Sequence, residues 1–174
     1  MISTNRFDLV WLEARVVRMF TSSPHEALRT LEVSNPDGLL TGEEQAIAEL
    51  FAQRLEQQPD HETWTIRAVI ERSSSTLVGH AGFHRRPNEQ GVLELGYTTS
   101  ASRRREGIAS EAVRGLLNAA SASSMVTTVR GVTDEDNRAS QRLLERLGFV
   151  FSENVVGTLG EKERLYLYDM TRAT

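Results

Sequence analysis

The 174-residue sequence has no cysteine and a single lysine, Lys162, against nineteen arginines. Without cysteine the chain forms no disulfide, uses no thiolate nucleophile and builds no cysteine-ligated zinc or iron–sulfur site, and this composition fits a reducing compartment. Phosphate-loop NTPases and Schiff-base enzymes each need a lysine in the site. Lys162 lies in the charged stretch 160–164, which is typical of a solvated turn, so neither class fits the sequence.

Long apolar runs and a strong net charge are missing as well. No stretch reaches the roughly 18 apolar residues of a membrane span, and the first residues lack the apolar core of a signal peptide. We therefore expect a cytoplasmic protein without a membrane partner. The net charge is −4, whereas nucleic-acid-binding modules are usually basic, so no nucleic-acid partner is expected. At about 150 residues per domain, the length predicts one domain over 1–174.

The spacing of apolar residues predicts an α+β fold with a mostly antiparallel sheet flanked by helices. Thr41 and Glu44 have the spacing of a capping box, which predicts that a helix opens there and runs to about Gln57. Gly148 stands where a glycine commonly follows a helix. The expected strands are 6–12, 64–71, 76–83, 92–98, 125–132, 149–156 and 164–170, and the expected helices are 13–33 with a break near 22–24, 41–57, 107–120 and 137–147.

The most informative segment is an apolar strand followed by three arginines and a glycine that opens a helix. Unpaired backbone N–H groups at a helix start, together with the helix dipole, form an anion site. Gly107 and Ala109 leave room for a ligand to approach the backbone. Arg103, Arg104 and Arg105 add attraction for a polyanion and bidentate contacts to phosphate. Taken alone, the segment fits a phosphate site and an ordinary surface loop equally well.

A second segment follows one strand later. The order and spacing of the two segments together favour the phosphate site over an ordinary surface loop. The residues that carry the pattern are Arg104-x-x-Gly107-x-Ala109, Asn137-x-x-Ser140 with Leu147-Gly148-Phe149, and in addition Leu77 to Phe83, Leu95-Gly96-Tyr97, Ser110-Glu111-Ala112 and Thr4-Asn5-Arg6-Phe7. Together they resemble the GNAT superfamily of N-acetyltransferases and, within it, the ribosomal-protein N-acetyltransferase branch. The resemblance covers nearly the whole chain.

The resemblance implies a GNAT-like fold with a central sheet of about seven strands. Its strands 92–98 and 125–132 would run parallel and splay apart, forming a slot for the pantetheine arm of acetyl-CoA, the cosubstrate; no metal is implied. Residues 1–60 would form variable helices on the acceptor side, and 61–174 the acetyl-CoA-binding core. The implied coenzyme contacts are Tyr97, Thr98, Thr99, Arg104, Arg105, Glu106, Gly107, Ile108, Ala109, Ser110, Asn137 and Ser140.

The implied reaction is direct attack of an amine on the acetyl thioester, which needs a base, an oxyanion donor and an acid for the thiolate. We choose Glu94 as the base, acting through water, because its apolar neighbours Leu93 and Leu95 are expected to raise its pKa. The alternative is that Glu94 is not the base and that its carboxylate simply reaches the surface or pairs with an arginine. A backbone N–H near Tyr97 is the expected oxyanion donor.

The acid is less clear from the sequence. Many GNAT enzymes carry a tyrosine four residues after the position of Ser140, and here that position is Leu144, which has no proton to donate. In the ribosomal-protein branch the serine looks like a substitute donor, so the resemblance implies Ser140. Tyr97 and Tyr166 are the alternative proton donors. The other interpretation of Ser140 is that it is an ordinary helix residue with no part in the reaction.

Two histidines follow the same strand. On a strand, His80 and His84 share a face but lie about 13 Å apart at 3.3 Å per residue, too far to bind one ion. A structural role is the favoured interpretation for both, and a position facing the acceptor pocket is the alternative.

The leading hypothesis is an enzyme that transfers an acetyl group from acetyl-CoA to a primary amine of a small molecule or a protein N-terminus. A catalytically silent acyl-CoA-binding or sensing module is the alternative, and the leucine at position 144 favours it. Dimers are common in the resembled branch, so a homodimer is an expectation from the resemblance, while the sequence itself leaves the oligomeric state open.

Overall fold

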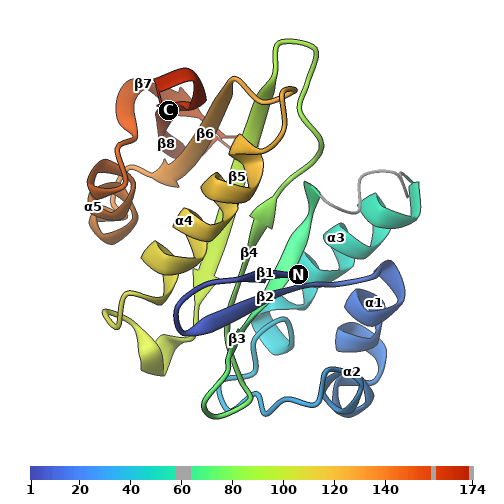
Figure 1. The fold of residues 1–174 in the computed structure, drawn as a ribbon. Coiled ribbons are helices and arrows are strands. Elements are labelled where there is room, and N and C mark those ends of the chain that lie inside the picture. The colour runs from blue at the N-terminus through green and yellow to red at the C-terminus, as the bar shows by residue number, and fades with distance from the viewer. Residues whose placement is uncertain (58–63, 158–159, 173–174) are drawn as a thin grey trace.

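The computed structural model describes residues 1–57, 64–157 and 160–172, which form one mixed sheet and its covering helices (Figure 1). The strand order is β1-β2-β3-β4-β5-β6-β8-β7, and all neighbours are antiparallel except the parallel pair β5 and β6. The strands are β1 (Ile2–Ser3), β2 (Phe7–Trp11), β3 (Ile66–Glu71), β4 (Thr76–Phe83), β5 (Val92–Thr99), β6 (Thr128–Asp134), β7 (Val150–Val156) and β8 (Lys162–Asp169).

This confirms the predicted α+β fold. The described residues hold eight strands rather than about seven, because β1 has two residues and is too short to leave an alternating pattern. The α-helices are α1 (Ala14–Ser22), α2 (Pro24–Leu31), α3 (Gln45–Gln57), α4 (Ile108–Ser121) and α5 (Arg138–Arg146), and the 3-10 turns are η1 (Gly42–Glu44), η3 (Ala101–Arg103) and η4 (Met170–Arg172). No helix in the described residues is long and apolar enough to cross a membrane.

The capping box predicted for Thr41 and Glu44 is absent. The Thr41 hydroxyl donates instead to the carbonyl of Gly38 at 2.6 Å, and Glu44 Oε2 accepts from the backbone N–H of Leu40 at 2.9 Å. Both side chains are therefore used by the turn before the helix. As a result, the 3-10 turn η1 comes first and α3 begins at Gln45.

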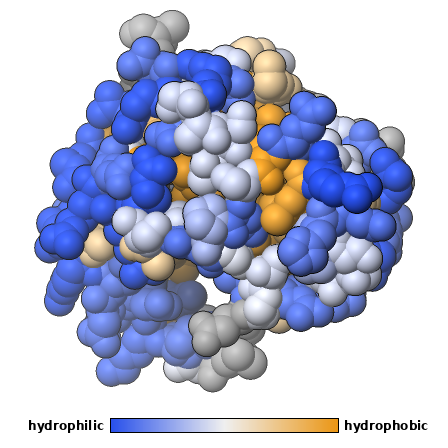
Figure 2. All heavy atoms as spheres, turned by 90° about the horizontal axis from the view of Figure 1, so that it is seen from below, coloured by the Kyte–Doolittle hydropathy of each residue, from blue (hydrophilic) through white to orange (hydrophobic). Residues whose placement is uncertain are grey.

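The two faces of the sheet carry two separate cores. Along β3 and β4, neighbouring residues alternate between them, as strand geometry requires. Ala68 and Leu77 pack with α1, α2 and α3, whereas Val69 and Val78 pack with α4, which lies across the sheet in Figure 1. The face seen in Figure 2 is mostly hydrophilic, and hydrophobic residues reach its surface in hollows between polar ones. We call the two sides of the sheet the α3 face and the α4 face.

The parallel strands β5 and β6 separate part of the way along. They pair from Val92 opposite Thr128 to Leu95 opposite Gly131. Beyond that point β5 continues alongside β4 alone, and β6 continues alongside β8 alone. The sheet therefore has a fork after Leu95, and among the described residues no strand pairs with the inner edges of β5 and β6 beyond it.

Candidate active site

A cavity of about 650 Å³ opens at the fork between β5 and β6. Its lining comes from α3, β4, β5, β6, α5 and the β7–β8 hairpin. Leu93 and Leu95 belong to the core of the α4 face. Because side chains alternate along a strand, Glu94 and Gly96 point to the α3 face and Tyr97 to the α4 face. The cavity thus reaches both sides of the sheet through the fork.

On the α4 face, the segment before α4 makes a tight turn of left-handed backbone. Arg105 has φ of 69° and Gly107, which precedes the helix, has φ of 78°. A Cβ atom on Gly107 would meet only the Arg6 side chain within 4 Å, at 3.5 Å. The first N–H groups of α4 have no partner within the helix, so this turn has the geometry of an anion site.

Arg103 does not take part in that site in the way the sequence suggested. Its guanidinium binds Glu71 at 3.0 Å and Glu106 at 2.7 Å. These bonds raise the pKa of Arg103 and lower the pKa values of both carboxyl groups. Because its donors are already used within the protein, Arg103 braces the loop, and the exposed Arg104 and Arg105 are left beside the turn.

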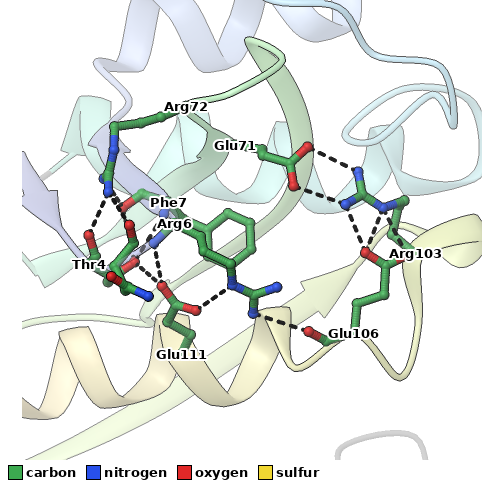
Figure 3. A network of polar contacts seen from close by, with 9 residues as sticks. Thr4, Arg6, Phe7, Glu71, Arg72, Arg103, Glu106 and Glu111 are labelled. Carbon is green, nitrogen blue, oxygen red and sulfur yellow. Dashed lines mark hydrogen bonds and ion pairs between the residues drawn. The ribbon is translucent and has the colours of Figure 1, made fainter.

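The N-terminal segment holds the other side of this loop (Figure 3). Glu111, in the first turn of α4, accepts from the Thr4 hydroxyl at 2.7 Å and from the Arg6 backbone N–H at 2.7 Å, and it pairs with the Arg6 guanidinium at 2.8 Å. Arg6 also donates to the backbone carbonyl of Glu106 at 3.0 Å. Two motifs that are about a hundred residues apart in the sequence therefore contact each other directly.

Tyr97 and Ser140 meet across the α4 side of the cavity. The Tyr97 hydroxyl lies 2.6 Å from Ser140 Oγ. Burial raises the pKa of Tyr97, so its phenol stays protonated at neutral pH. Asn137 caps α5, because its Oδ1 accepts from the Ser140 backbone N–H at 3.0 Å.

Tyr166, the remaining candidate for the acid, and Leu144, the residue at the usual tyrosine position, both lie away from the cavity. Tyr166 is fully buried, and its hydroxyl binds Glu145 at 3.3 Å. Leu144 is also buried, and its methyl groups would lie 3.1–3.2 Å from a Cβ atom on Gly131. Neither side chain lines the cavity, so Tyr97 and Ser140 are the hydroxyl pair at the fork.

On the α3 face, Glu94 lies between His84 and Arg130. Its Oε1 is 2.6 Å from His84 Nδ1, and its Oε2 accepts from the Arg130 Nε at 2.7 Å and from Arg130 Nη2. The bond to His84 is the largest cause that lowers the pKa of Glu94 to about 2, with Arg130 adding to it and burial opposing it. The prediction that the pKa of Glu94 is raised is therefore wrong. Leu93 and Leu95, on which it was based, face the opposite side of the sheet.

The two histidines differ in their surroundings. His80 is buried, and its Nε2 lies 3.4 Å from Glu44 Oε2, as expected for a structural residue. His84 is partly exposed and lines the cavity. The sequence reasoning missed the pairing of His84 with Glu94. The register of the β4–β5 hairpin is the signal that could have predicted this pairing, because it places His84 opposite Glu94. The His84 backbone N–H donates to the Glu94 carbonyl at 2.9 Å.

The described residues contain no group of three or more histidine, aspartate or glutamate side chains placed to hold a metal ion. The groups that meet at the fork include the carboxylate of Glu94, the His84 ring and the hydroxyl groups of Tyr97 and Ser140, beside a backbone turn suited to an anion.

Comparisons with known proteins agree with this geometry. A family model described as an acetyltransferase (GNAT) domain matches residues 14–150. An uncharacterized N-acetyltransferase of Bacillus subtilis (strain 168), YjdG, is 25% identical over 152 residues, which cover 87% of this chain and 90% of that protein. The match therefore extends over most of the chain.

Two solved structures share the fold. A putative ribosomal-protein-serine acetyltransferase from Vibrio cholerae superposes with a TM-score of 0.69 at 20% identity, covering 97% of this chain and 96% of that one. The microcin C7 self-immunity acetyltransferase MccE, solved in complex with acetyl-CoA and AMP, gives a TM-score of 0.66 at 12% identity, covering 95% and 93%. Since the family model spans more than half of the chain, this protein belongs to the GNAT family of acetyltransferases and transfers an acetyl group from acetyl-CoA to an amine.

Proposed function

We propose that acetyl-CoA lies in the fork between β5 and β6, and that the enzyme acetylates a primary amine that enters from the α3 face. The observation that carries this proposal is the end of pairing after Leu95, which leaves one backbone edge of β5 without a neighbour. An extended pantetheine arm pairs with such an edge as an added strand does. Tyr97, Thr98 and Thr99 lie on that edge and are the proposed contacts.

The diphosphate of the coenzyme is proposed to bind the turn before α4. The contacts there are the backbone N–H groups from Arg105 to Ser110, which include Glu106, Gly107, Ile108 and Ala109. The left-handed backbone at Arg105 and Gly107 supports this assignment, because it turns the chain toward the helix start without a side chain in the way. Arg104 adds charge from outside, and Asn137 at the start of α5 supplies an amide.

Tyr97, assisted by Ser140, is proposed to protonate the departing thiolate. The supporting observations are the short contact of 2.6 Å between the two hydroxyl groups and the raised pKa of Tyr97. The proton removed from Tyr97 is replaced through Ser140. An oxyanion donor is proposed in the backbone N–H groups of β5 near Tyr97, which become available where pairing with β6 ends.

Glu94 is a weak base at neutral pH because its pKa is about 2. We therefore propose that Glu94 orients its neighbours and does not itself accept the proton.

The acceptor is proposed to be a primary amine of a small molecule or of a protein N-terminus. Asp134 and Glu163 line the α3 side of the cavity, and their charges favour a cationic amine. Helix α3 contributes Ile47 and Phe51 to the same wall, in agreement with an acceptor side built by 1–60. The name of the Vibrio cholerae structure directs the first test to a peptide that begins with serine. A cytoplasmic location is proposed, since acetyl-CoA is an intracellular metabolite and the chain has no cysteine.

The test combines binding with turnover. Acetyl-CoA at 100 times its Kd should stabilise the protein by about 2.7 kcal/mol, seen as a higher Tm. CoA thiol release is then measured with a serine-initiated tripeptide amide, an alanine-initiated one and spermidine. Release that depends on one of these amines supports the proposal. No rise in Tm contradicts it, and a rise without thiol release from a broad amine panel supports a silent binding module instead.

A further inference from the structure

The His84 ring is held in one orientation on the α3 side of the cavity. Its Nδ1 lies 2.6 Å from Glu94 Oε1. One ring edge packs against Phe51 of α3, with ring centroids 6.2 Å apart. The side chain is 33% exposed and lines the cavity. Two neighbours therefore fix the ring, while part of it remains open to an incoming molecule.

The bond to Glu94 decides which ring nitrogen can act as a base. Glu94 is ionised, and an ionised carboxylate only accepts hydrogen bonds, so Nδ1 of His84 must carry the hydrogen. In the neutral ring the free lone pair is then on Nε2. The carboxylate of a Ser-His-Asp triad holds its histidine in the same tautomer.

Nε2 lies against the backbone at the fork. A Cβ atom on Gly96 would be only 2.6 Å from His84 Nε2. Gly96 directly follows Leu95, the last residue of β5 that pairs with β6. His84 Nε2 therefore lies beside Gly96, where the pairing of β5 and β6 has just ended, and the absence of a side chain at Gly96 makes room for the ring.

We propose that His84 is the general base of the acetyl transfer and that Glu94 is the positioning residue that holds it. The proposal rests on the function proposed above and assigns the one step that was left without a residue there. Geometry carries it: a ring oriented by two neighbours, a carboxylate on Nδ1 that favours one tautomer, and Nε2 beside Gly96 at the fork.

The proton inventory of the step is complete. The ammonium form of the acceptor first releases one proton to solvent. As the neutral amine nitrogen then forms its bond to the acetyl carbon, His84 Nε2 accepts the second proton that the nitrogen loses. The carbon–sulfur bond breaks, and the sulfur takes a proton from Tyr97. Solvent then removes the proton from His84 and returns one to Tyr97. Each turnover converts one amine and one acetyl-CoA into one amide and one CoA thiol.

Several charged groups face this pair, and they bear on its pH dependence. Arg130 on β6 binds Glu94 on the side away from His84. Charges from α3 and β8 also act on this region, since Arg54 and Glu163 each interact electrostatically with Glu94. Further titratable groups nearby are Arg85, next to His84 in the chain, His80 on β4 with its partner Glu44, and Asp134 and Glu161 in the cavity lining. Positive and negative charges thus surround the pair on different sides.

The first experiment measures kcat/KM against pH for the wild type and for His84→Gln, with acetyl-CoA and a serine-initiated tripeptide amide. The ratio of the two values cancels the titration of the amine, because both proteins use the same substrates. We expect the ratio to rise from about 1 at low pH to about 100 or more at high pH, because only the neutral ring can accept a proton. His25→Gln, a histidine of α2 outside the cavity, should keep a ratio of about 1 throughout.

Either of two kinetic results would overturn the proposal. One is a ratio that stays flat with pH. The other is a loss in Glu94→Gln that exceeds the loss in His84→Gln, since that would make Glu94 the base. Acetyl-CoA affinity, measured by calorimetry, should be unchanged in His84→Gln. A wild type that binds no acetyl-CoA refutes the proposed function, which separates that failure from a failure of the histidine assignment.

The second experiment needs no acceptor. Nitrogen-15 NMR of the imidazole rings reports the tautomer, and His84→Gln identifies the signals of His84. We expect the Nδ1–H form in the wild type at a pH where the ring is neutral, and a mixture of tautomers in Glu94→Gln. An Nε2–H form in the wild type would contradict the proposed role of both residues.

Discussion

The two sides of the cavity are built in different ways. On the α4 face, a short continuous segment from η3 into α4 makes the turn, and ion pairs from Arg6 and Arg103 hold it in place. On the α3 face, the wall comes from α3, β4, β6 and the β7–β8 hairpin, and its centre is the trio His84, Glu94 and Arg130. Local backbone geometry thus defines the proposed coenzyme side, whereas side chains from separate elements define the proposed acceptor side.

This difference indicates on which side of the cavity single substitutions can alter function. A site made by backbone groups tolerates few changes in its turn but depends little on individual side chains. A site assembled from separate elements depends on each contributing side chain and can be altered one residue at a time. The following predictions test this contrast, starting from the largest expected effect.

Replacement of the proposed acid is expected to have the largest effect. Tyr97→Phe removes the hydroxyl that lies 2.6 Å from Ser140, so kcat should fall by about 100-fold. The Kd of acetyl-CoA should stay the same, because the proposed contacts of Tyr97 with the coenzyme use its backbone. Tyr166→Phe is the matched control, since that hydroxyl is buried against Glu145, and its kcat should not change. Equal kcat values for wild type and Tyr97→Phe would exclude this tyrosine as the acid.

Loss of the brace at the start of α4 should affect stability first. Glu111→Ala removes the acceptor of three hydrogen bonds from Thr4 and Arg6, which should cost about 2 kcal/mol in the free energy of unfolding. The KM for acetyl-CoA should rise, and kcat should change little. Urea denaturation and steady-state kinetics measure both effects.

The control for this prediction is Glu49→Ala on α3. Glu49 forms only an exposed ion pair with Arg18 at 3.7 Å, so its removal should leave stability unchanged. If the two variants are equally stable, the N-terminal segment does not brace the loop.

The charge of Glu94 should make stability depend on pH in the acid range. Its pKa falls from the ordinary glutamate value of 4.5, which applies to the unfolded chain, to about 2 in the folded protein. A lowered pKa stabilises the fold above the unfolded value, and this contribution is lost as the pH falls from 4.5 toward 2. Solvent screens the ion pair with the exposed Arg130, so the loss in the free energy of unfolding should be about 1 kcal/mol.

Denaturation curves for the wild type and Glu94→Gln measure this loss directly. The difference in stability between them should shrink as the solution is acidified through that range. A difference that is constant with pH would show that the ion pairs of Glu94 do not form in solution.

The smallest effect is expected from the exposed arginines of the turn. Arg104→Gln should weaken acetyl-CoA binding by about threefold, with the difference vanishing at high salt, and it should not change stability. Arg103→Gln should instead lower stability, because it loses Glu71 and Glu106. Calorimetry at two salt concentrations and thermal denaturation distinguish the two roles. The reverse pattern would mean that Arg103, and not Arg104, faces the diphosphate.

The same contrast explains what could be predicted from the sequence. The elements and the turn at Gly107 leave local patterns, because strand alternation, helix spacing and a glycine before a helix act over a few residues. The resemblance supplied the parallel pairing and the splay of the strands, which no local pattern encodes. β1 was missed because two residues hold no pattern, and the capping box at Thr41 failed because the preceding turn uses both side chains.

The acceptor side could not be predicted in the same way. The pKa of Glu94 depends on Arg130, which lies in the next strand of the sheet, and on the register that brings His84 opposite it. The sequence neighbours of Glu94 suggested the opposite shift, although they face the other core. The role of Arg103 likewise depends on Glu71 at the end of β3, thirty-two residues away in the chain.

The most direct test of the central claim is a crystal structure of the protein with acetyl-CoA. The account predicts that the pantetheine arm runs along β5 from Gly96 to Thr99 and that the diphosphate contacts the backbone N–H groups at the start of α4, with the acetyl group near His84 Nε2. A coenzyme bound elsewhere on the protein, or a fork that is closed by β5 and β6 pairing beyond Leu95, would contradict it.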